Sequence, residues 1–358
     1  GGSPAINAYV GWAGEQLKKR HDISLVHVKL TDTSEAVSRI LAEKAAGKSA
    51  GGSVDLVWVN GENFASLKRD GLLRQDPWAF DLPSFSYTDS SALPAILSDF
   101  AVDTEGLESP WGRAQLVFGY DSRYVDVPPL SADALAKWIT ANPGRFTFPQ
   151  PPDFTGTSFL KQIALELAPD MSVFQMHADK SDTDSVLAPL WQWLELVYPF
   201  LWRGGTSYPK NYTDMVQLLG DGELSFAMAF NPAEFSNGIA NGVLPDTVRS
   251  YIHEGGTLAN VHFVAIPFNS SASEGARITA NFLLSPEAQL HKAHPDIWGD
   301  PTVLAHHRLP PEIQAAFDQL PRGLATLSEA ELSRTLREPH PSWVSIIEQE
   351  WEKRFLLR

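Results

Sequence analysis

Three short polar segments precede predicted helices, and their residue types suit ligand binding better than catalysis. They are Gly1-Gly2-Ser3, Asn60–Asn63 and Thr155–Ser158. Such turns direct unpaired backbone N–H groups outward, and the helix dipole adds partial positive charge there. Helix capping is the alternative for any one of them, but three such turns favour a site for an anion or polar ligand. The residues expected to contact ligand here are Gly2, Ser3, Asn60, Glu62, Asn63, Gly156, Thr157 and Ser158.

Three aromatic residues lie in predicted loops, namely Trp111, Trp202 and Tyr208. An aromatic side chain in a loop can clamp a flat ring or a cation. The alternative is that each ring packs between elements, because Trp is usually largely buried. We include all three in the predicted ligand-binding set.

Two polar residues follow the apolar stretch Leu224–Phe230 directly. They are Asn231 and Glu234, and the stretch has the composition of a buried strand. Ligands of α/β proteins collect at the carboxyl ends of strands. Asn231 and Glu234 therefore complete the predicted ligand-binding set.

Specific catalytic and metal-binding patterns are missing from the sequence. His291 and His294 are three residues apart, but no Glu lies between them and the chain has no Cys, so a zinc-hydrolase pattern is not met. There is also no Gly-x-Ser-x-Gly turn and no phosphate-binding Gly-x-x-x-x-Gly-Lys-Ser/Thr loop. We predict that the chain is not an enzyme and has no catalytic residue, metal or cofactor. The alternative is a metal-assisted hydrolase that uses His291, His294 or His306 with a carboxylate.

The composition excludes several classes of protein. A length of 358 residues favours two domains, and 43% hydrophobic residues indicate a packed protein. The formal charge of −15 would repel a phosphate backbone, so we expect no nucleic-acid partner. The most apolar stretch, Val186–Trp202, is interrupted by polar residues and prolines. It falls short of the roughly 20 apolar residues that a membrane span needs.

Strands and helices alternate along the chain. Helical spacing and capping patterns predict helices from Pro4 to about Arg20, after Asp32 with Glu35, and from near Thr157 or Ser158. Ser285 followed by Pro286 predicts the start of a further helix. Predicted strands are Ile23–Leu30, Asp55–Val59, Phe146–Phe148 and Leu224–Phe230. This alternation predicts an α/β protein with mostly parallel sheets and helices on both faces.

Two further strands, at 115–120 and 261–266, have no helix of their own. We interpret them as hinge crossings between two lobes. The predicted N-terminal lobe comprises residues 1–113 and 262–310, and the C-terminal lobe comprises residues 114–261 and 311–358.

Four stretches resemble segments of the periplasmic binding proteins of ABC importers, in particular an uncharacterised, thiamine- and iron-type branch of the family 1 extracellular solute-binding proteins. They are Asn281–Gln289 (NFLLSPEAQ), Leu219–Phe230 (LGDGELSFAMAF), Gly255–Pro267 and Val54–Asn63. The resemblance implies the two-lobed, type II periplasmic-binding-protein fold. It also implies a transport receptor that closes about its hinge on a solute held in the cleft between the lobes.

The resemblance sets further expectations about partners and ligand. It implies an exported, periplasmic, monomeric receptor for a membrane permease, whose signal peptide is not in this chain and whose first strand would lie just before Gly1. The expected ligand is a small organic molecule, anionic, phosphate-bearing or thiamine-like. Iron is disfavoured because the adjacent Tyr pair of the ferric-binding members is missing. A domain that binds only protein partners is a further alternative.

Overall fold

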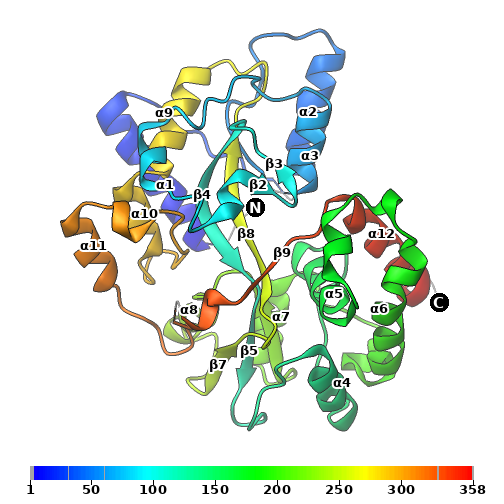
Figure 1. Ribbon diagram of the computed structural model, residues 1–358. Coiled ribbons are helices and arrows are strands. Elements are labelled where there is room, and N and C mark those ends of the chain that lie inside the picture. The colour runs from blue at the N-terminus through cyan, green and yellow to red at the C-terminus, as the bar shows by residue number, and fades with distance from the viewer. Residues whose placement is uncertain (1–3, 31, 60, 329, 357–358) are drawn as a thin grey trace. The chain divides into compact units, whose positions relative to one another are not determined.

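The computed structural model describes residues 4–30, 32–59, 61–328 and 330–356. The chain divides into two compact units. Unit 1 comprises Gly1–Ala114 and Asn260–Pro321, and unit 2 comprises Gln115–Ala259 and Arg322–Arg358. Figure 1 shows the elements of both units along the chain. Within the described ranges, every helix is too short or too polar to span a lipid bilayer.

Unit 1 is built on a sheet with helices on both faces. Its helices are α1 (Pro4–His21), α2 (Ser34–Ala45), α3 (Glu62–Arg69), α9 (Ser273–Leu283), α10 (Pro286–Ala293) and α11 (Pro311–Asp318). Its strands are β1 (Val57–Val59), β2 (Ser98–Asp99), β3 (Val102–Asp103), β4 (Glu108–Gln115) and β8 (Thr257–Ala265), and both β4 and β8 continue into unit 2. The strand order is β1-β8-β4, and β1 runs antiparallel to β8.

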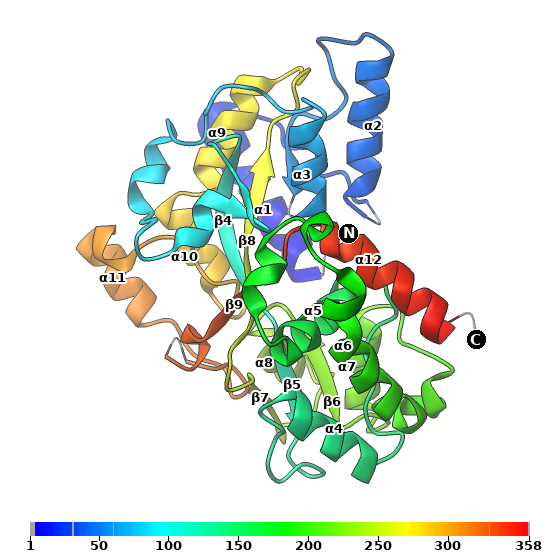
Figure 2. The same cartoon turned by 45° about the vertical axis from the view of Figure 1, so that its right-hand side comes forward.

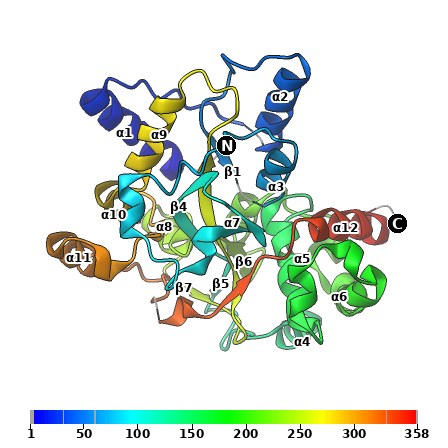
Figure 3. The same cartoon turned by 45° about the horizontal axis from the view of Figure 1, so that its top comes forward.

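The alternation of side chains along β1 places them in two separate cores. Val57 and Val59 belong to a core that includes residues of α2 and α3. Trp58 packs on the other core, which contains residues of α1, α9 and α10. This is the two-residue period of a strand that is covered on both faces. Figure 3 shows α1 and α9 on one side of β8 and α2 and α3 on the other.

Unit 2 has a smaller sheet and one continuous core. Its helices are α4 (Ala132–Ala141), α5 (Phe154–Leu167), α6 (Thr183–Val197), α7 (Tyr212–Gly220), α8 (Glu234–Ala240) and α12 (Ser342–Trp351). Its strands are β5 (Val117–Asp121), β6 (Phe226–Ala229), β7 (Val248–Tyr251) and β9 (Thr335–Arg337). The sheet order is β6-β5-β7, with both pairings antiparallel. Figure 2 shows α12 beside α5, where the C-terminal segment joins the core.

Several predicted elements are confirmed by their local hydrogen bonds. Asp32 and Glu35 form the expected capping box of α2, since Asp32 Oδ1 accepts the Ser34 N–H and Glu35 Oε1 accepts the Asp32 N–H. The hydroxyl of Ser285 accepts the Ala288 N–H at the start of α10. In these places the signal lies within four residues of sequence.

Two predicted strands do not form. Residues 23–30 belong to no helix or strand in the described part of the chain, and Val26 is 78% exposed. Phe146 and Phe148 are fully buried, yet they also lie outside the sheets. A β-branched or apolar run reports only that a segment suits a pleated or buried environment. A ladder needs a neighbouring strand along its whole length.

The prediction of mostly parallel sheets is not confirmed. The β1–β8, β2–β3, β5–β6 and β5–β7 pairings are antiparallel, and β9 pairs in parallel with β8. The two predicted strands that do not form, at 23–30 and 146–148, each precede a helix. Such strand–helix units were expected to connect parallel strands. Without these two strands, the pairings given above include only one parallel pair, β8 with β9.

Candidate functional site

In unit 2, polar residues at the starts of α5, α7 and α8 lie near one another beyond β6. Asp153 precedes α5, Tyr212 begins α7 and Glu234 begins α8. Burial, followed by the nearby Glu234 carboxyl, raises the pKa of Tyr212 to about 12, and Asp153 adds to this shift. The predicted Glu234 therefore belongs to a cluster with two residues that the sequence analysis did not select.

Helix α5 begins three or four residues earlier than predicted, and its start is occupied by the protein's own carboxylate. Asp153 Oδ1 accepts the N–H groups of Thr155 at 2.9 Å and Gly156 at 3.1 Å. The Thr157 N–H is bonded to the Asp153 carbonyl. The expectation that this turn presents unpaired N–H groups to an anion is therefore wrong. The capping carboxylate was available as a signal, because Asp is a preferred N-cap residue.

Gly156, Thr157 and Ser158 are buried in the first turn of α5. A Cβ atom on Gly156 would lie 2.0 Å from the Pro149 carbonyl oxygen, so only Gly fits this position. The Thr157 hydroxyl donates to Glu348 at 2.7 Å. These contacts give the three residues a role in packing α5, and their role in ligand binding stays a prediction.

Two phenylalanines beside this cluster were missed by the sequence analysis. Phe154 is 41% exposed, and its ring centroid lies 4.8 Å from that of Phe230. Phe230 directly follows β6, and the side chain of the next residue, Asn231, accepts the Ala233 N–H. An aromatic pair beside carboxylates, with one ring exposed and the other half-buried, offers both an apolar surface and a π-face to a ligand. The signal was the position of each Phe next to a polar turn.

The two predicted loop aromatics of unit 2 contact other side chains of the unit. The Trp202 indole N–H donates to Glu223, and the Arg203 guanidinium lies 4.1 Å from the Trp202 ring centroid. The Tyr208 ring packs against Phe148 and Trp351. Their contact with ligand remains a prediction.

The electrostatics of the unit 2 cluster are acidic. Burial raises the pKa of Glu234. Burial also raises the pKa of Asp153, although the N–H groups of α5 oppose this shift. Among the described residues, the Glu234 side chain has no hydrogen-bond or ion-pair partner. A partly buried carboxylate without a partner is stabilised by any cation placed against it.

In unit 1, the start of α3 is also held by a carboxylate. Glu62 is exposed and Asn63 is half-buried in the first turn. The N–H of Gly61, just before the helix, donates to Asp99 Oδ2 at 2.8 Å. The Gly61 N–H, in the predicted ligand turn, is therefore already bonded. The predicted contacts Gly2, Ser3 and Asn60 lie outside the described residues.

Trp111 lies within β4 and not in a loop, which corrects the prediction for this residue. Its ring is buried against Tyr9, Trp58 and Trp298. The physical reason is that the residues around it, Glu108–Gln115, form strand β4, which lies next to β8 in the sheet. A buried ring in a strand cannot act as a clamp from a loop.

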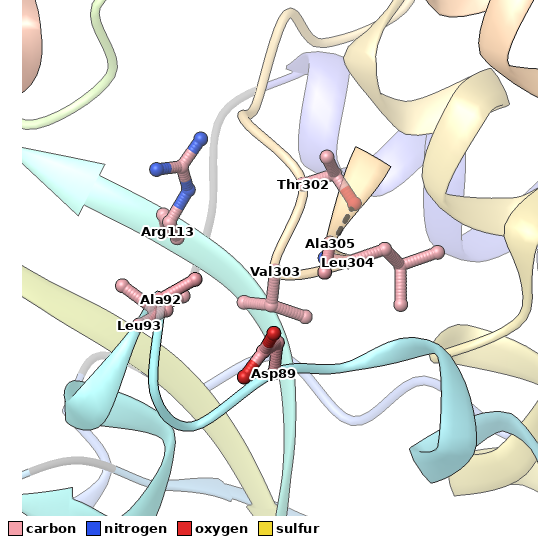
Figure 4. Close-up of a pocket in the computed structure, with 8 residues that line it drawn as sticks. All are labelled: Asp89, Ala92, Leu93, Arg113, Thr302, Val303, Leu304 and Ala305. Atoms are coloured by element: carbon pink, nitrogen blue, oxygen red, sulfur yellow. Dashed lines mark hydrogen bonds between the residues drawn. The ribbon is translucent and has the colours of Figure 1, made fainter. Parts of the chain in front are cut away.

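Unit 1 also contains a small pocket of about 140 Å³. Its lining residues are Asp89, Ala92, Leu93, Arg113, Thr302, Val303, Leu304 and Ala305. Figure 4 shows Arg113 on one side and Asp89 on another. The Asp89 carboxylate lies 3.2 Å from His307 and 3.6 Å from Arg308, so its charge is largely balanced. None of the residues predicted from the sequence lines this pocket.

The histidines offer no metal centre. In the described part of the chain, no group of three or more His, Cys, Asp or Glu side chains could hold a metal ion. His291 stacks on Trp12 at 3.8 Å, and His306 pairs with Asp318. The hydrolase alternative therefore gains no site from the structure.

Comparison with known proteins decides the family. A family model described as "Bacterial extracellular solute-binding protein" matches residues 12–318. The chain belongs to this family. This solute-binding protein is 45% identical over 355 residues to Protein YnjB of Escherichia coli (strain K12), which covers 99% of the chain and 89% of YnjB.

Solved structures share the fold of this solute-binding protein at low identity. A putative spermidine/putrescine ABC transporter from Listeria monocytogenes has a TM-score of 0.65 and 16% identity, covering 96% of each chain. The periplasmic binding protein AfuA from Actinobacillus pleuropneumoniae, with fructose-6-phosphate bound, also has a TM-score of 0.65, with 14% identity over 98% of this chain and 96% of AfuA. The chain therefore has the periplasmic-binding-protein fold. As a member of the family, it is a solute-binding protein and not an enzyme.

Proposed function

We propose that this protein is the periplasmic, monomeric receptor of an ABC-type importer, and that it delivers a small organic solute to a membrane permease. The solute is bound by the polar helix starts of both units, which close on it about the β4 and β8 connections. The family assignment and the division into two units support this role. The task needs only reversible binding, because closure of the receptor supplies the signal to the permease.

We further propose that the solute carries a cationic group. The observation that carries this proposal is the Glu234 carboxylate, which is half-buried and has no partner among the described residues. An ammonium group bonded to it would replace the solvation that burial removes. Phe154 and Phe230 add an aromatic surface of the kind that attracts cations and flat rings.

The anionic and phosphate-bearing solutes expected from the sequence are less compatible with these sites. Asp99 already accepts a hydrogen bond from a backbone N–H group at the start of α3, and Asp153 accepts hydrogen bonds from two N–H groups at the start of α5. A phosphate placed there would meet a carboxylate in each unit. A thiamine-like solute keeps its place in the proposal, because it combines a ring with a positive charge. The spermidine/putrescine title of the Listeria relative is in line with this class, whereas AfuA shows that the same fold takes a sugar phosphate.

A thermal-shift screen tests the solute class. Its panel comprises putrescine, spermidine, thiamine and choline, with sugars and phosphate esters as the contrasting set. A solute at 100 times its Kd adds about 2.7 kcal/mol to the free energy of unfolding, which is a readily measured shift. We expect stabilisation by at least one amine. Stabilisation by phosphate esters alone would refute the cationic class.

Substitution of Glu234 by Gln tests the site with the stabilising amine. A hydrogen bond to a charged group contributes about 1.5–3 kcal/mol, so titration calorimetry should show a Kd increase of about ten- to a hundredfold. Glu312→Gln is the matched control, because Glu312 also lies in the first turn of a helix but is exposed. Equal affinities for wild type and Glu234→Gln would place the cation elsewhere.

A further inference from the structure

Unit 1 contains a pair of buried carboxyl groups that the proposed solute contacts do not use. The side chains are Asp99 on β2 and Glu108 on β4, and each residue is 1% exposed. Neither oxygen of the Glu108 carboxyl has a hydrogen-bond partner in the described part of the chain. The buried hydroxyl of Thr104 is likewise without one. Buried polar groups are nearly always bonded, so Glu108 requires a physical explanation.

The charged groups around Glu108 do not neutralise it. They are Asp99, which is negative, and Lys68 on α3. The Lys68 ammonium donates to the Asp103 carbonyl at 2.6 Å and pairs with Glu105 at 2.9 Å. Burial, followed by the charge of Asp99, raises the pKa of Glu108 well above its usual range. A neutral Glu108 avoids placing a second negative charge next to Asp99.

Asp99 is tied to the turn that starts α3. Its Oδ2 accepts the Gly61 N–H at 2.8 Å. Gly61 has a φ of +59°, and a Cβ atom there would lie 2.6 Å from the ring of Phe100. Phe100 itself lies in the tight turn between β2 and β3, where its φ is +41°. The β2–β3 hairpin therefore holds the Gly61 turn through the hydrogen bond to Asp99 and the close approach of the Phe100 ring.

We propose that Asp99 is the positioning residue for the Gly61 turn, and that this role requires the buried Glu108 to stay neutral. Ionisation of Glu108 would place a second negative charge near Asp99. Repulsion between the two carboxylates would then push Asp99 away from the Gly61 N–H. The relevance of the turn to solute capture rests on the proposed function, because Glu62 and Asn63 follow it directly. The positioning itself does not depend on any solute.

Amide hydrogen exchange of Gly61, measured by NMR at rising pH up to the onset of global unfolding and corrected for the intrinsic rate, tests the proposal. In the wild type, protection of the Gly61 amide should fall about tenfold or more as the pH passes the raised pKa of Glu108. In Glu108→Gln, which keeps the shape but cannot ionise, protection should stay constant. The Ala65 amide, which is bonded within the same region to the Gly61 carbonyl, reports general loss of α3.

Two Asp99 variants separate positioning from general stability. Asp99→Ala removes the acceptor, so Gly61 should lose about tenfold or more of its protection at every pH while Ala65 keeps its own. Asp99→Asn retains an acceptor oxygen and should restore most of the protection, with a flatter pH profile. A Glu108→Gln profile identical to that of the wild type would overturn the proposal. So would unchanged Gly61 protection in Asp99→Ala.

These outcomes are independent of the solute. If no amine binds but the Gly61 amide follows the expected pattern, the proposed solute class fails and the positioning role stands. If an amine binds normally and Gly61 shows no dependence on Glu108, the positioning role fails alone.

Discussion

Helix α5 is joined to the C-terminal segment by a buried ion pair, and removing one partner should be costly. The Lys161 ammonium lies 2.6 Å from the Glu338 carboxylate, and the two side chains are only 2% and 3% exposed. The ammonium also lies 5.6 Å from the centroid of the Phe154 ring. Lys161→Met keeps much of the apolar stem but removes the ammonium group that pairs with the buried Glu338 carboxylate.

The expected loss follows from this burial. Breaking a buried pair by removing one partner costs about 3–5 kcal/mol, because the remaining charge has lost both water and its counter-ion. In a domain of 150–250 residues, each kcal/mol lowers Tm by about 2–4 °C. Calorimetric unfolding should therefore show the transition of unit 2 about 6–20 °C lower in Lys161→Met. The double variant Lys161→Met/Glu338→Leu should recover most of the loss, since two apolar groups need no counter-charge.

The chain offers a matched control for this prediction. Lys353 and Glu350 are also 2.6 Å apart in unit 2, but the Lys353 side chain is 68% exposed. Exposed pairs contribute about 0–1 kcal/mol, so Lys353→Met should shift the transition little. The reasoning is refuted if the two single variants lose the same stability, or if the double variant is no better than Lys161→Met.

Three further predictions concern pH and packing. A hydrogen bond from Asn269, with others from Ser53 and Lys48, lowers the pKa of Glu43 to about 2. The contribution of Glu43 to the free energy of unfolding is therefore present above its unfolded-state pKa and is lost as the pH falls towards 2. Urea unfolding should therefore show that Glu43→Gln is less stable than the wild type at pH 7 and as stable as the wild type near pH 2. The same loss of stability at both pH values would contradict this. Because burial raises the pKa of Glu234, the affinity for a quaternary ammonium, whose charge does not titrate, should fall as the pH is lowered through that pKa. A pH-independent Kd in titration calorimetry would rule this out. In Gly156→Ala, the free energy of unfolding should fall by about 1–3 kcal/mol, because the added Cβ overpacks against the Pro149 carbonyl. Thermal unfolding at the same temperature as the wild type would disprove this steric argument.

Local patterns predicted helices well because capping is decided within one turn. Asp32 with Glu35, and Ser285 before Pro286, each form the hydrogen bonds that their spacing indicated. The same reasoning missed the start of α5. Gly156 was interpreted as part of a turn, whereas it is a close-packed residue inside the helix.

Contacts between distant segments could not be predicted from one sequence. Asp99 binds Gly61 across 38 residues, and no local pattern near either residue signals this bond. Residues 23–30 have the composition of a strand, but pairing depends on which neighbour is available. The burial of Trp111 could not be predicted for the same reason. Its ring is covered by Tyr9, Trp58 and Trp298, which come from three other segments of the chain.

Native mass spectrometry of the freshly purified protein is the most direct test of the central claim, because tightly bound solutes copurify with their receptors. The account predicts a one-to-one complex with a small organic cation, and loss of the bound mass in Glu234→Gln but not in Glu312→Gln. A copurified phosphate ester or metal ion that persists in Glu234→Gln would contradict it.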